Sequence, residues 1–343
     1  MRASYLEAMT NPFTAAAARL VGIGFDGSSP TTEVAALVDR GVRTVILFAR
    51  NAGEREEVVR TIAGVKALAP SPDDPIMVCV DQEGGRTVRF RDGFDPPPSM
   101  REIGRGGPEA AAEIGSRLAA DLRPVGIDLD LAPVVDVDSN PANPVIGARS
   151  FGGDPEEVGS CGAALVRAMQ AGGVAACAKH FPGHGDTDSD SHHDLPVLRH
   201  GRGRLDRVEL PPFRAVIEAG VAAIMTTHVV FEAMDPGVPA TMSRAAIDGL
   251  LRTELGFDGV VISDDLEMAA IAELPELEGD LGEAAVRAVD AGVDLVLCCH
   301  QPARQARVVD AVAAAIDSGR LPEDRIRDAH RRLDRLFTRF VAP

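Results

Sequence analysis

The segment 179–196, KHFPGHGDTDSDSHHDLP, concentrates side chains that can transfer protons or bind metals. Its 18 residues include four histidines, four aspartates and one lysine, but few large apolar groups. Pro182, Gly183 and Gly185 disfavour a regular helix near its start. Because such a segment contributes little to a hydrophobic core, its composition indicates a functional loop rather than a solvated turn.

The elements that must hold this loop can be predicted from the periodicity of apolar residues. The sequence AGGVAACAK that leads into the loop predicts a short buried strand after a glycine turn. Similar apolar runs recur along the chain, as expected of parallel strands covered on both faces, with amphipathic helical patterns between them. The predicted strands are 20–25, 43–48, 76–81, 127–131, 174–179, 222–227, 259–263 and 293–298. The predicted helices are 31–40, 55–69, 108–122, 155–171, 210–219, 244–255 and 281–291.

Eight βα units without a linker or a change in composition predict an α/β fold, a single (β/α)8 TIM-type barrel. This catalytic domain would span residues 1–343, with 1–15 as an N-terminal extension. A doubly wound open sheet is the alternative, because a strand count does not prove that the sheet closes. In a barrel, active-site groups follow the carboxyl ends of the strands. The polar positions there are Asp81, 130–136, Lys179, His180, His228, Asp264 and 299–300.

Composition restricts the partners and the compartment. The net charge of −17 repels nucleic acids and anionic membranes. Three of the five cysteines, Cys79, Cys177 and Cys298, lie inside predicted strands, which indicates buried thiols in a reducing compartment. The sequence contains neither 18 consecutive apolar residues nor a signal-peptide pattern. We therefore expect a cytoplasmic, monomeric protein that binds neither nucleic acid nor membrane.

A glycine motif near the N-terminus imitates a dinucleotide-binding turn. Gly22, Gly24 and Gly27 fit the pattern G-x-G-x-x-G after a predicted strand. A dinucleotide site places the third glycine within the following helix, whereas here the helix begins after Gly27, at Pro30. The motif therefore does not predict a nucleotide cofactor.

Three aspartates of the 179–196 loop imitate an EF-hand. Asp186, Asp188 and Asp190 have the spacing of its first ligands. Position 6 would be Ser191 instead of glycine, and position 12 would be Val197 instead of glutamate. Both the turn and the bidentate ligand are missing, so calcium is not predicted.

A transition metal held by His180 and His184 is the remaining cofactor hypothesis. Pro182 and Gly183 interrupt the helix that would place both rings on one face. We therefore predict no metal and no other cofactor, and we keep a metal-dependent hydrolase as an alternative.

Two further segments place acidic groups after predicted strands, VCVDQEGGRTVRF (78–90) and GFDGVVISDDLEM (256–268). With them the chain resembles glycoside hydrolase family 3, and within it the single-domain bacterial β-N-acetylglucosaminidases that act on cell-wall sugars. The resemblance covers roughly residues 15–340, and the pattern KHFPGHGDT…DSH is specific to it. Other matching segments are LFARN (47–51), NPVIGARSF (143–151) and MTTHV (225–229).

The resemblance implies a role for individual residues. The nucleophile of the family matches the first aspartate of SDD, Asp264, and the acid/base matches the histidine of D-S-H, His192, oriented by Asp190. His228 belongs either to the sugar pocket or to the loop structure. The residues that match the family's contacts to the sugar hydroxyls and acetamido group are Asp81, Arg89, Arg149, Lys179 and His180.

General chemistry supports the same roles. Retaining glycoside hydrolysis needs a carboxylate on one side of the sugar ring and a proton donor at the leaving oxygen. Asp264, at the end of an apolar strand, would be held rigidly, and a histidine with an ordinary pKa of about 6.5 can donate and then accept a proton near neutrality. Asp190 lies two residues before His192 and could orient its ring.

The other polar residues of these segments are predicted to be structural. Asp265 would cap the helix that follows it, and His184 would hold the loop by hydrogen bonds. We expect the 179–192 loop to be mobile, because it contains glycines and lacks apolar anchors between Gly183 and Asp194. Asp136 and Asp138 would brace the loop of Arg149, Arg86 would be structural, and His200 and His330 would be solvated.

The sequence thus predicts an exo-acting, retaining β-N-acetylglucosaminidase that releases terminal GlcNAc from carbohydrates such as peptidoglycan fragments. A phosphorylase is an alternative, since a histidine acid/base would not repel phosphate as a glutamate does. A sugar-binding protein without activity on the same scaffold is the alternative outside the enzymes, but Asp264 and His192 are both present.

Overall fold

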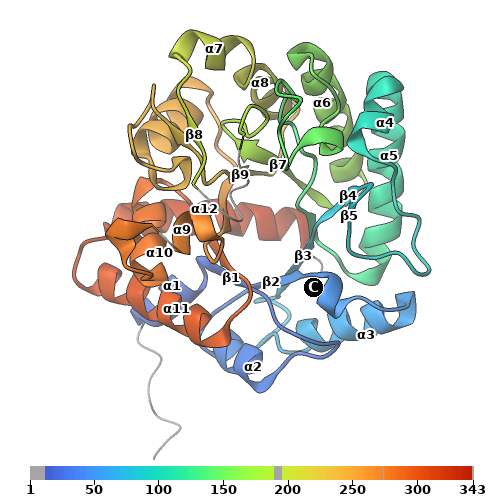
Figure 1. The fold of residues 1–343 in the computed structure, drawn as a ribbon. Coiled ribbons are helices and arrows are strands. Elements are labelled where there is room, and N and C mark those ends of the chain that lie inside the picture. Colours follow the sequence, from blue (N-terminus) through green and yellow to red (C-terminus); the bar gives the residue numbers. More distant parts are fainter. Residues whose placement is uncertain (1–11, 189–194, 273, 342–343) are drawn as a thin grey trace, which may run out of the picture.

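Eight parallel strands close into a single barrel in a computed structural model that describes residues 12–188, 195–272 and 274–341 (Figure 1). The first strand pairs with both the second and the last, which confirms the predicted (β/α)8 barrel and excludes the open sheet. Every predicted strand is present. They are β1 (Val21–Ile23), β2 (Thr44–Leu47), β3 (Met77–Val80), β6 (Leu129–Asp130), β7 (Ala175–Phe181), β9 (Ala223–Thr226), β11 (Val260–Asp265) and β12 (Leu295–Cys298).

Helices form the outer layer, and every predicted helix is found, although the segment predicted at 244–255 is the π-helix η5 (Ala245–Glu254). The other predicted helices are α2 (Thr32–Asp39), α3 (Arg55–Lys66), α5 (Gly107–Leu122), α6 (Pro155–Ala171), α8 (Leu210–Glu218) and α10 (Leu281–Ala291). Helices without a sequence prediction are α1 (Pro12–Ala18), α4 (Met100–Arg105), α7 (Arg202–Arg207), α9 (Ala269–Ala272), α11 (Pro302–Asp317) and α12 (Glu323–Phe340). Short helical turns are η1 (Ala49–Asn51), η2 (Arg123–Val125), η3 (Gly147–Arg149), η4 (Ala240–Met242) and η6 (Pro275–Leu277).

The core lies within the barrel and between the barrel and its helices. Strands such as Thr44–Leu47 and Met77–Val80 are buried at every position, as their near-continuous apolar sequence requires. Helix starts are fixed by caps: the Asp154 carboxylate accepts two backbone N–H bonds at the start of α6, and Asp280 does the same for α10. Because the barrel is rigid, the loops at its strand ends have fixed starting points.

Helix α12 crosses the amino-terminal end of the barrel and lies behind the ring of strands in Figure 1. Its apolar residues Ile326, Ala329 and Leu333 repeat at helical spacing and are buried. On its polar side, Arg325 and Arg332 contact Asp294, which directly precedes β12. This end of the barrel is therefore closed, and only the opposite end can open to a substrate.

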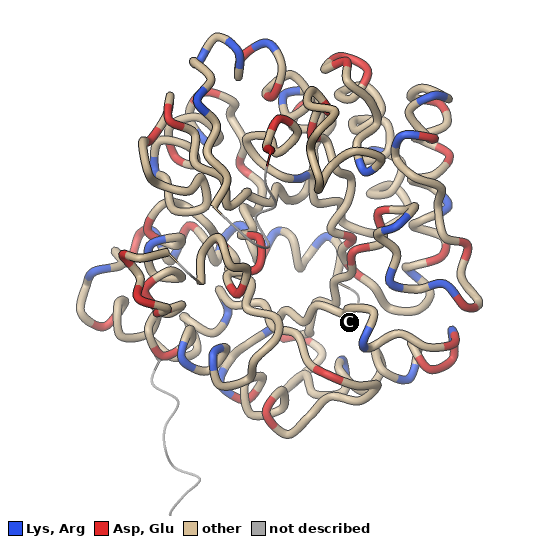
Figure 2. Tube along the Cα trace, viewed as in Figure 1, with Lys and Arg blue, Asp and Glu red and all other residues tan. Residues whose placement is uncertain are grey.

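Two small sheets stand at that opposite end. The hairpin β4 (Gln82–Gly84) and β5 (Thr87–Val88) follows β3, and the parallel pair β8 (Val197–Leu198) and β10 (Val230–Phe231) lies beside the end of β9. Figure 2 shows charged residues of both signs spread over the outer helices and loops. In the described part of the chain, no helix has the length and apolar character needed to cross a membrane.

Candidate active site

A cavity of about 240 Å³ opens at the carboxyl ends of the barrel strands. It is lined by side chains that follow β3, β7, β11 and β12, so residues far apart in sequence meet there. Apolar side chains such as Ile46 and Met225 form part of its wall. Six of the residues singled out from the sequence line it together: Asp81, Arg89, Arg149, Lys179, His180 and Asp264.

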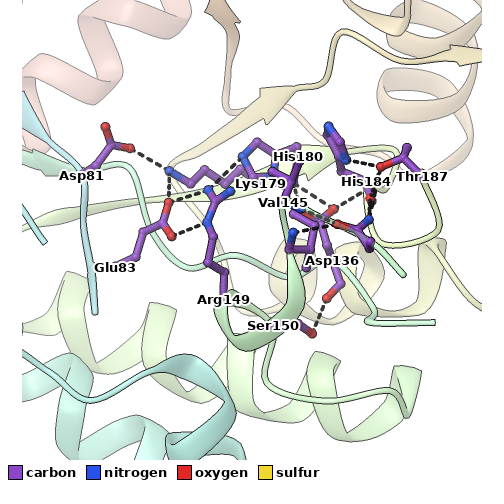
Figure 3. A network of polar contacts seen from close by, with 12 residues as sticks. Asp81, Glu83, Asp136, Val145, Arg149, Ser150, Lys179, His180, His184 and Thr187 are labelled. Carbon is purple, nitrogen blue, oxygen red and sulfur yellow. Dashed lines mark hydrogen bonds and ion pairs between the residues drawn. The ribbon is translucent and has the colours of Figure 1, made fainter. Parts of the chain in front are cut away.

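One wall of the cavity is a cluster of ion pairs (Figure 3). The Lys179 ammonium lies 2.7 Å from an Asp81 oxygen and 2.6 Å from a Glu83 oxygen. Arg149 donates from Nε and Nη2 to the two oxygens of Glu83, at 2.8 Å each. Arg89 Nη2 lies 3.1 Å from the other oxygen of Asp81. The cluster therefore combines two carboxylates with three cations.

The mutual contacts keep these groups charged. Burial alone would raise the pKa of Asp81 and Glu83, but Lys179 and the arginines hold both below their usual values. Burial would lower the pKa of Lys179, and the two carboxylates raise it instead. Among the described residues the Lys179 ammonium donates to two carboxylates, so one of its three N–H groups can meet a sugar hydroxyl.

A second polar unit connects His180 to Asp136. The Asp136 carboxylate lies 2.7 Å from His180 Nδ1 and accepts the backbone N–H of His184 at 2.7 Å (Figure 3). Arg149 Nη2 is 3.4 Å from His180 Nε2, and an arginine can only donate. His180 thus directs Nδ1 toward the Asp136 carboxylate and Nε2 toward Arg149.

Asp136 therefore has a different role from the one predicted. Its carboxylate holds His180 and His184 instead of the loop of Arg149, although its carbonyl does accept the Ser150 hydroxyl at 2.6 Å. Burial would raise the pKa of Asp136, but the two histidines keep it below the usual value. The brace predicted from Asp138 is confirmed: it pairs with Arg101, whose guanidinium reaches the carbonyls of Gly147 and Ser150.

His184 holds the loop, as predicted. Its ring is buried, and Nδ1 lies 2.9 Å from the Thr187 hydroxyl. Burial, together with the positive field of His180, lowers the pKa of His184 to about 4. The ring is therefore neutral near pH 7.

Asp264 lies near the carboxyl end of β11 and faces the cavity. Its carboxylate accepts the backbone N–H of Asp265 at 2.8 Å. Burial would raise the pKa of Asp264, but His228 and His180 bring it below its usual value. An ionised carboxylate held on a strand end is the group that covalent glycoside catalysis requires.

Asp265 also lines the cavity, whereas His228 is buried behind it. Asp265 was predicted to cap the following helix, but α9 begins only at Ala269. Its carboxylate instead accepts the backbone N–H of Glu267 at 3.1 Å in the preceding turn and pairs with His300 at 3.0 Å. His228 is fully buried, contacts Thr241 Oγ1 at 2.8 Å and the Asp265 carbonyl at 3.0 Å, and does not line the cavity. Direct contact between His228 and the sugar is therefore not supported, because packing against β11 removes the ring from the cavity.

Asp130, at the end of β6, is a buried acid without a predicted role. One oxygen accepts the backbone N–H of Gln82 at 2.9 Å. Burial, opposed only in part by that bond and Lys179, raises the pKa of Asp130 to about 8. Asp130 is thus mainly protonated at neutral pH, beneath the charged cluster.

Two predicted residues, Asp190 and His192, lie outside the described residues. The predicted structural contact of Arg86 is present, since its guanidinium donates to the carbonyl of Val145. His200 and His330 were expected to be solvated; this is confirmed for His200, whose side chain is 37% exposed, whereas His330 is partly buried. His200 pairs with Asp186, and His330 bonds to the carbonyl of Ala16, because segments distant in sequence pack beside both rings.

Cys299 and His300 line the cavity, as expected from their position at a strand end, whereas Glu83 is a cavity residue that sequence reasoning did not single out. Glu83 lies inside the DQEGG motif, where the two glycines suggested a turn. Its position two residues after a predicted strand end was the available signal. Among the described ranges, no group of three or more histidine, cysteine or acidic side chains could hold a metal ion.

Residues 17–336 match the model of the glycosyl hydrolase family 3 N terminal domain. A protein of Thiobacillus denitrificans named beta-hexosaminidase is 42% identical over 288 residues, which cover 82% of this chain and 77% of that protein. A similar protein from Stenotrophomonas maltophilia, with the same name, is 41% identical over 266 residues.

Solved structures show the same architecture. A family 3 β-N-acetylglucosaminidase from Paenibacillus is 44% identical with a TM-score of 0.92, covering 96% of this chain. This chain spans only 62% of that protein's length. NagZ from Neisseria gonorrhoeae, solved in complex with N-trifluoroacetyl-D-glucosamine, is 31% identical with a TM-score of 0.76, covering 92% of this chain and 97% of its own.

Proposed function

The chain belongs to glycosyl hydrolase family 3, and we propose that it is a retaining exo-β-N-acetylglucosaminidase that releases terminal GlcNAc. The observation that carries this proposal is the ionised Asp264 carboxylate, which shares one small cavity with the cluster of Lys179, Asp81, Glu83 and Arg149. The carboxylate is the nucleophile, and the cluster binds the sugar hydroxyls.

In the proposed reaction Asp264 attacks the anomeric carbon while the bond from that carbon to the leaving oxygen breaks. His192, oriented by Asp190, gives its proton to the leaving oxygen. Water then attacks the anomeric carbon, the bond from that carbon to Asp264 breaks and restores the carboxylate, and His192 takes the proton of that water. The roles of Asp190 and His192 are carried over from the family motif alone.

The size of the cavity favours action on chain ends. At about 240 Å³ it is smaller than the roughly 300–1,000 Å³ typical of sites for drug-sized ligands, so it fits one sugar residue. Met225, Met268 and Leu297 provide apolar surface for a sugar face or an acetamido methyl group. We propose carbohydrates such as peptidoglycan fragments as substrates, and a cytoplasmic monomer without metal as the active form.

The decisive test is Asp264→Asn assayed on an aryl β-N-acetylglucosaminide in phosphate-free buffer. We expect a loss in kcat of about 10⁴-fold or more, as for other removed nucleophiles. Asp258→Asn is the matched control, since Asp258 lies exposed before the opposite end of β11, where it pairs with Arg332 and Arg335 and does not line the cavity. Turnover by Asp264→Asn at the wild-type rate would refute the proposal.

Phosphorolysis is the second candidate, favoured by one excess cation within the ion-pair cluster, although Asp264 and Asp265 add two further carboxylates to the lining of the cavity. Arg89, Arg149 and Lys179 face only two carboxylates in their cluster, which suits an incoming phosphate dianion. Product analysis in phosphate buffer separates the two reactions. GlcNAc-1-phosphate as the main product would replace hydrolysis by phosphorolysis.

A further inference from the structure

Asp186 connects three separate segments of the chain. Its carboxylate lies 3.1 Å from Arg204 Nη2, accepts the Ser139 hydroxyl at 3.2 Å and contacts His200 Nε2. Ser139 follows β6, His200 follows β8, and Arg204 lies on α7. We call this group of four residues the clamp. Its central carboxylate is only 15% exposed.

The chain around Asp186 is packed closely against its neighbours. A Cβ atom at Gly185 would lie 1.7 Å from the carbonyl oxygen of Val137, so no side chain fits there. A Cβ atom at Gly183 would lie 2.8 Å from Cγ of Glu209. Residues 183–187 are therefore packed through backbone contacts in place of the missing apolar anchors, and the predicted mobility of the loop stays a prediction.

The other side of the clamp is fixed as well. Strand β8 (Val197–Leu198) pairs with β10, and His200 returns to Asp186 two residues after β8 ends. Arg204 also lies 3.2 Å from the buried Glu209 carboxylate, which secures α7 to the start of α8. The contact between Asp186 and His200 thus joins the two ends of the segment 187–199.

That segment contains Asp190 and His192. Fixing the two ends of a connecting segment reduces the number of conformations that the segment can sample. This restriction costs entropy, and the contacts of the clamp offset that cost in the folded state. We propose that Asp186 is a positioning residue that acts through His192, since the clamp holds the ends of the segment so that the acid/base reaches the leaving oxygen. This inference rests on the proposed function.

The proposal makes a specific kinetic prediction. While Asp264 bonds to the anomeric carbon, a leaving oxygen of high pKa must receive the proton of His192, whereas 2,4-dinitrophenolate departs without it. In Asp186→Asn we expect kcat/KM to fall roughly 10- to 100-fold on the phenyl β-N-acetylglucosaminide, a part of the 10²–10⁴ that general acid catalysis supplies. On the 2,4-dinitrophenyl substrate we expect less than about a threefold change.

Two further variants keep the test informative if Asp186→Asn folds poorly. His200→Leu removes one donor to Asp186 and should show the same leaving-group dependence, whereas His200→Gln retains an N–H donor and should restore most of the activity. Asp206→Asn is the matched control, because Asp206 lies on α7 but pairs with Arg202 at the surface. It should leave both rates unchanged.

The outcomes separate this inference from the function on which it rests. Equal losses on both substrates, or no loss on either, in Asp186→Asn and His200→Leu would overturn the clamp as a positioning device. Absence of wild-type turnover on both substrates would refute the proposed function and this inference with it. Loss confined to the phenyl substrate supports the inference.

Discussion

Buried carboxylates occur at both ends of the barrel, but their partners differ. At the amino-terminal end, Asp128 and Asp294 each directly precede a strand and are fully buried. Each accepts a backbone N–H from the neighbouring strand, from Val78 and Val261 respectively. Each also pairs with cations that reach in from the outer helices and turns.

Hollows also occur at this closed end: Lys66 lines one of about 400 Å³ and Arg332 one of about 320 Å³, but among the described residues neither is lined by a carboxylate at the carboxyl end of a barrel strand. Lys66 lies 2.9 Å from Asp128, and Arg252, Arg325 and Arg332 surround Asp294. These ion pairs attach the outer helices to the barrel. At the open end, Lys179 and Arg149 contact Glu83 in the same way but line the cavity. A buried ion pair therefore does not indicate a functional site by itself, and neither does a cation beside a hollow; the open end differs because its cations share one cavity with Asp264.

The largest effect that this comparison predicts is on stability at the closed end. Asp294→Ala leaves Arg252 and Arg325 without their buried carboxylate, and removing one member of a buried ion pair costs about 3–5 kcal/mol. We expect the free energy of unfolding in urea to fall by that amount, with KM for the aryl substrate unchanged. A raised KM in a still folded variant would contradict the separation of the two ends.

The open end should be the first to weaken in acid. The pKa of His184 is lowered to about 4 in the folded protein, whereas it is about 6.5 in the unfolded chain. Between these two pH values the unfolded chain binds a proton at this histidine and the folded chain does not. The stability contributed by the neutral ring is complete above pH 6.5 and is lost as the pH falls toward 4. The loss amounts to about 3 kcal/mol.

Urea unfolding of the wild type and His184→Gln between pH 7 and 4.5 measures this contribution. The variant should lose less stability over that interval, although it starts from a lower value. Asp136 and Glu83 have lowered pKa values and therefore become protonated only at more acidic pH. His330 also has a lowered pKa, but it is present in both proteins, so its contribution cancels in the comparison. Parallel curves for the two proteins would show that His184 is not the acid-sensitive group.

The sequence allowed the frame of the molecule to be predicted in more detail than its contacts. Strand ends could be located from apolar runs, and this was sufficient to bring Asp81, Lys179 and Asp264 together, because barrel closure places all strand ends at one rim. Helix α12 could also have been predicted from its apolar spacing. The partners of His200 and His228 could not, because they depend on which distant segments pack beside each ring.

Glu83→Gln tests the open end in the way that Asp294→Ala tests the closed one. The amide oxygen can still accept hydrogen bonds from Arg149 and Lys179, but the neutral side chain no longer balances their charges, and its NH₂ group cannot accept from Arg149. Water in the cavity can solvate the released cations, so we expect less than about 2 kcal/mol loss in unfolding free energy, well below the cost at Asp294. The misplaced donors should raise KM roughly 10- to 100-fold on both aryl substrates, because binding contacts rather than proton transfer are lost. Isothermal titration with GlcNAc should show the same decrease in affinity.

If stability falls as far as in Asp294→Ala while KM is unchanged, Glu83 is a structural carboxylate like those at the closed end. In that case Asp81 and Arg89 provide the contacts to the sugar instead.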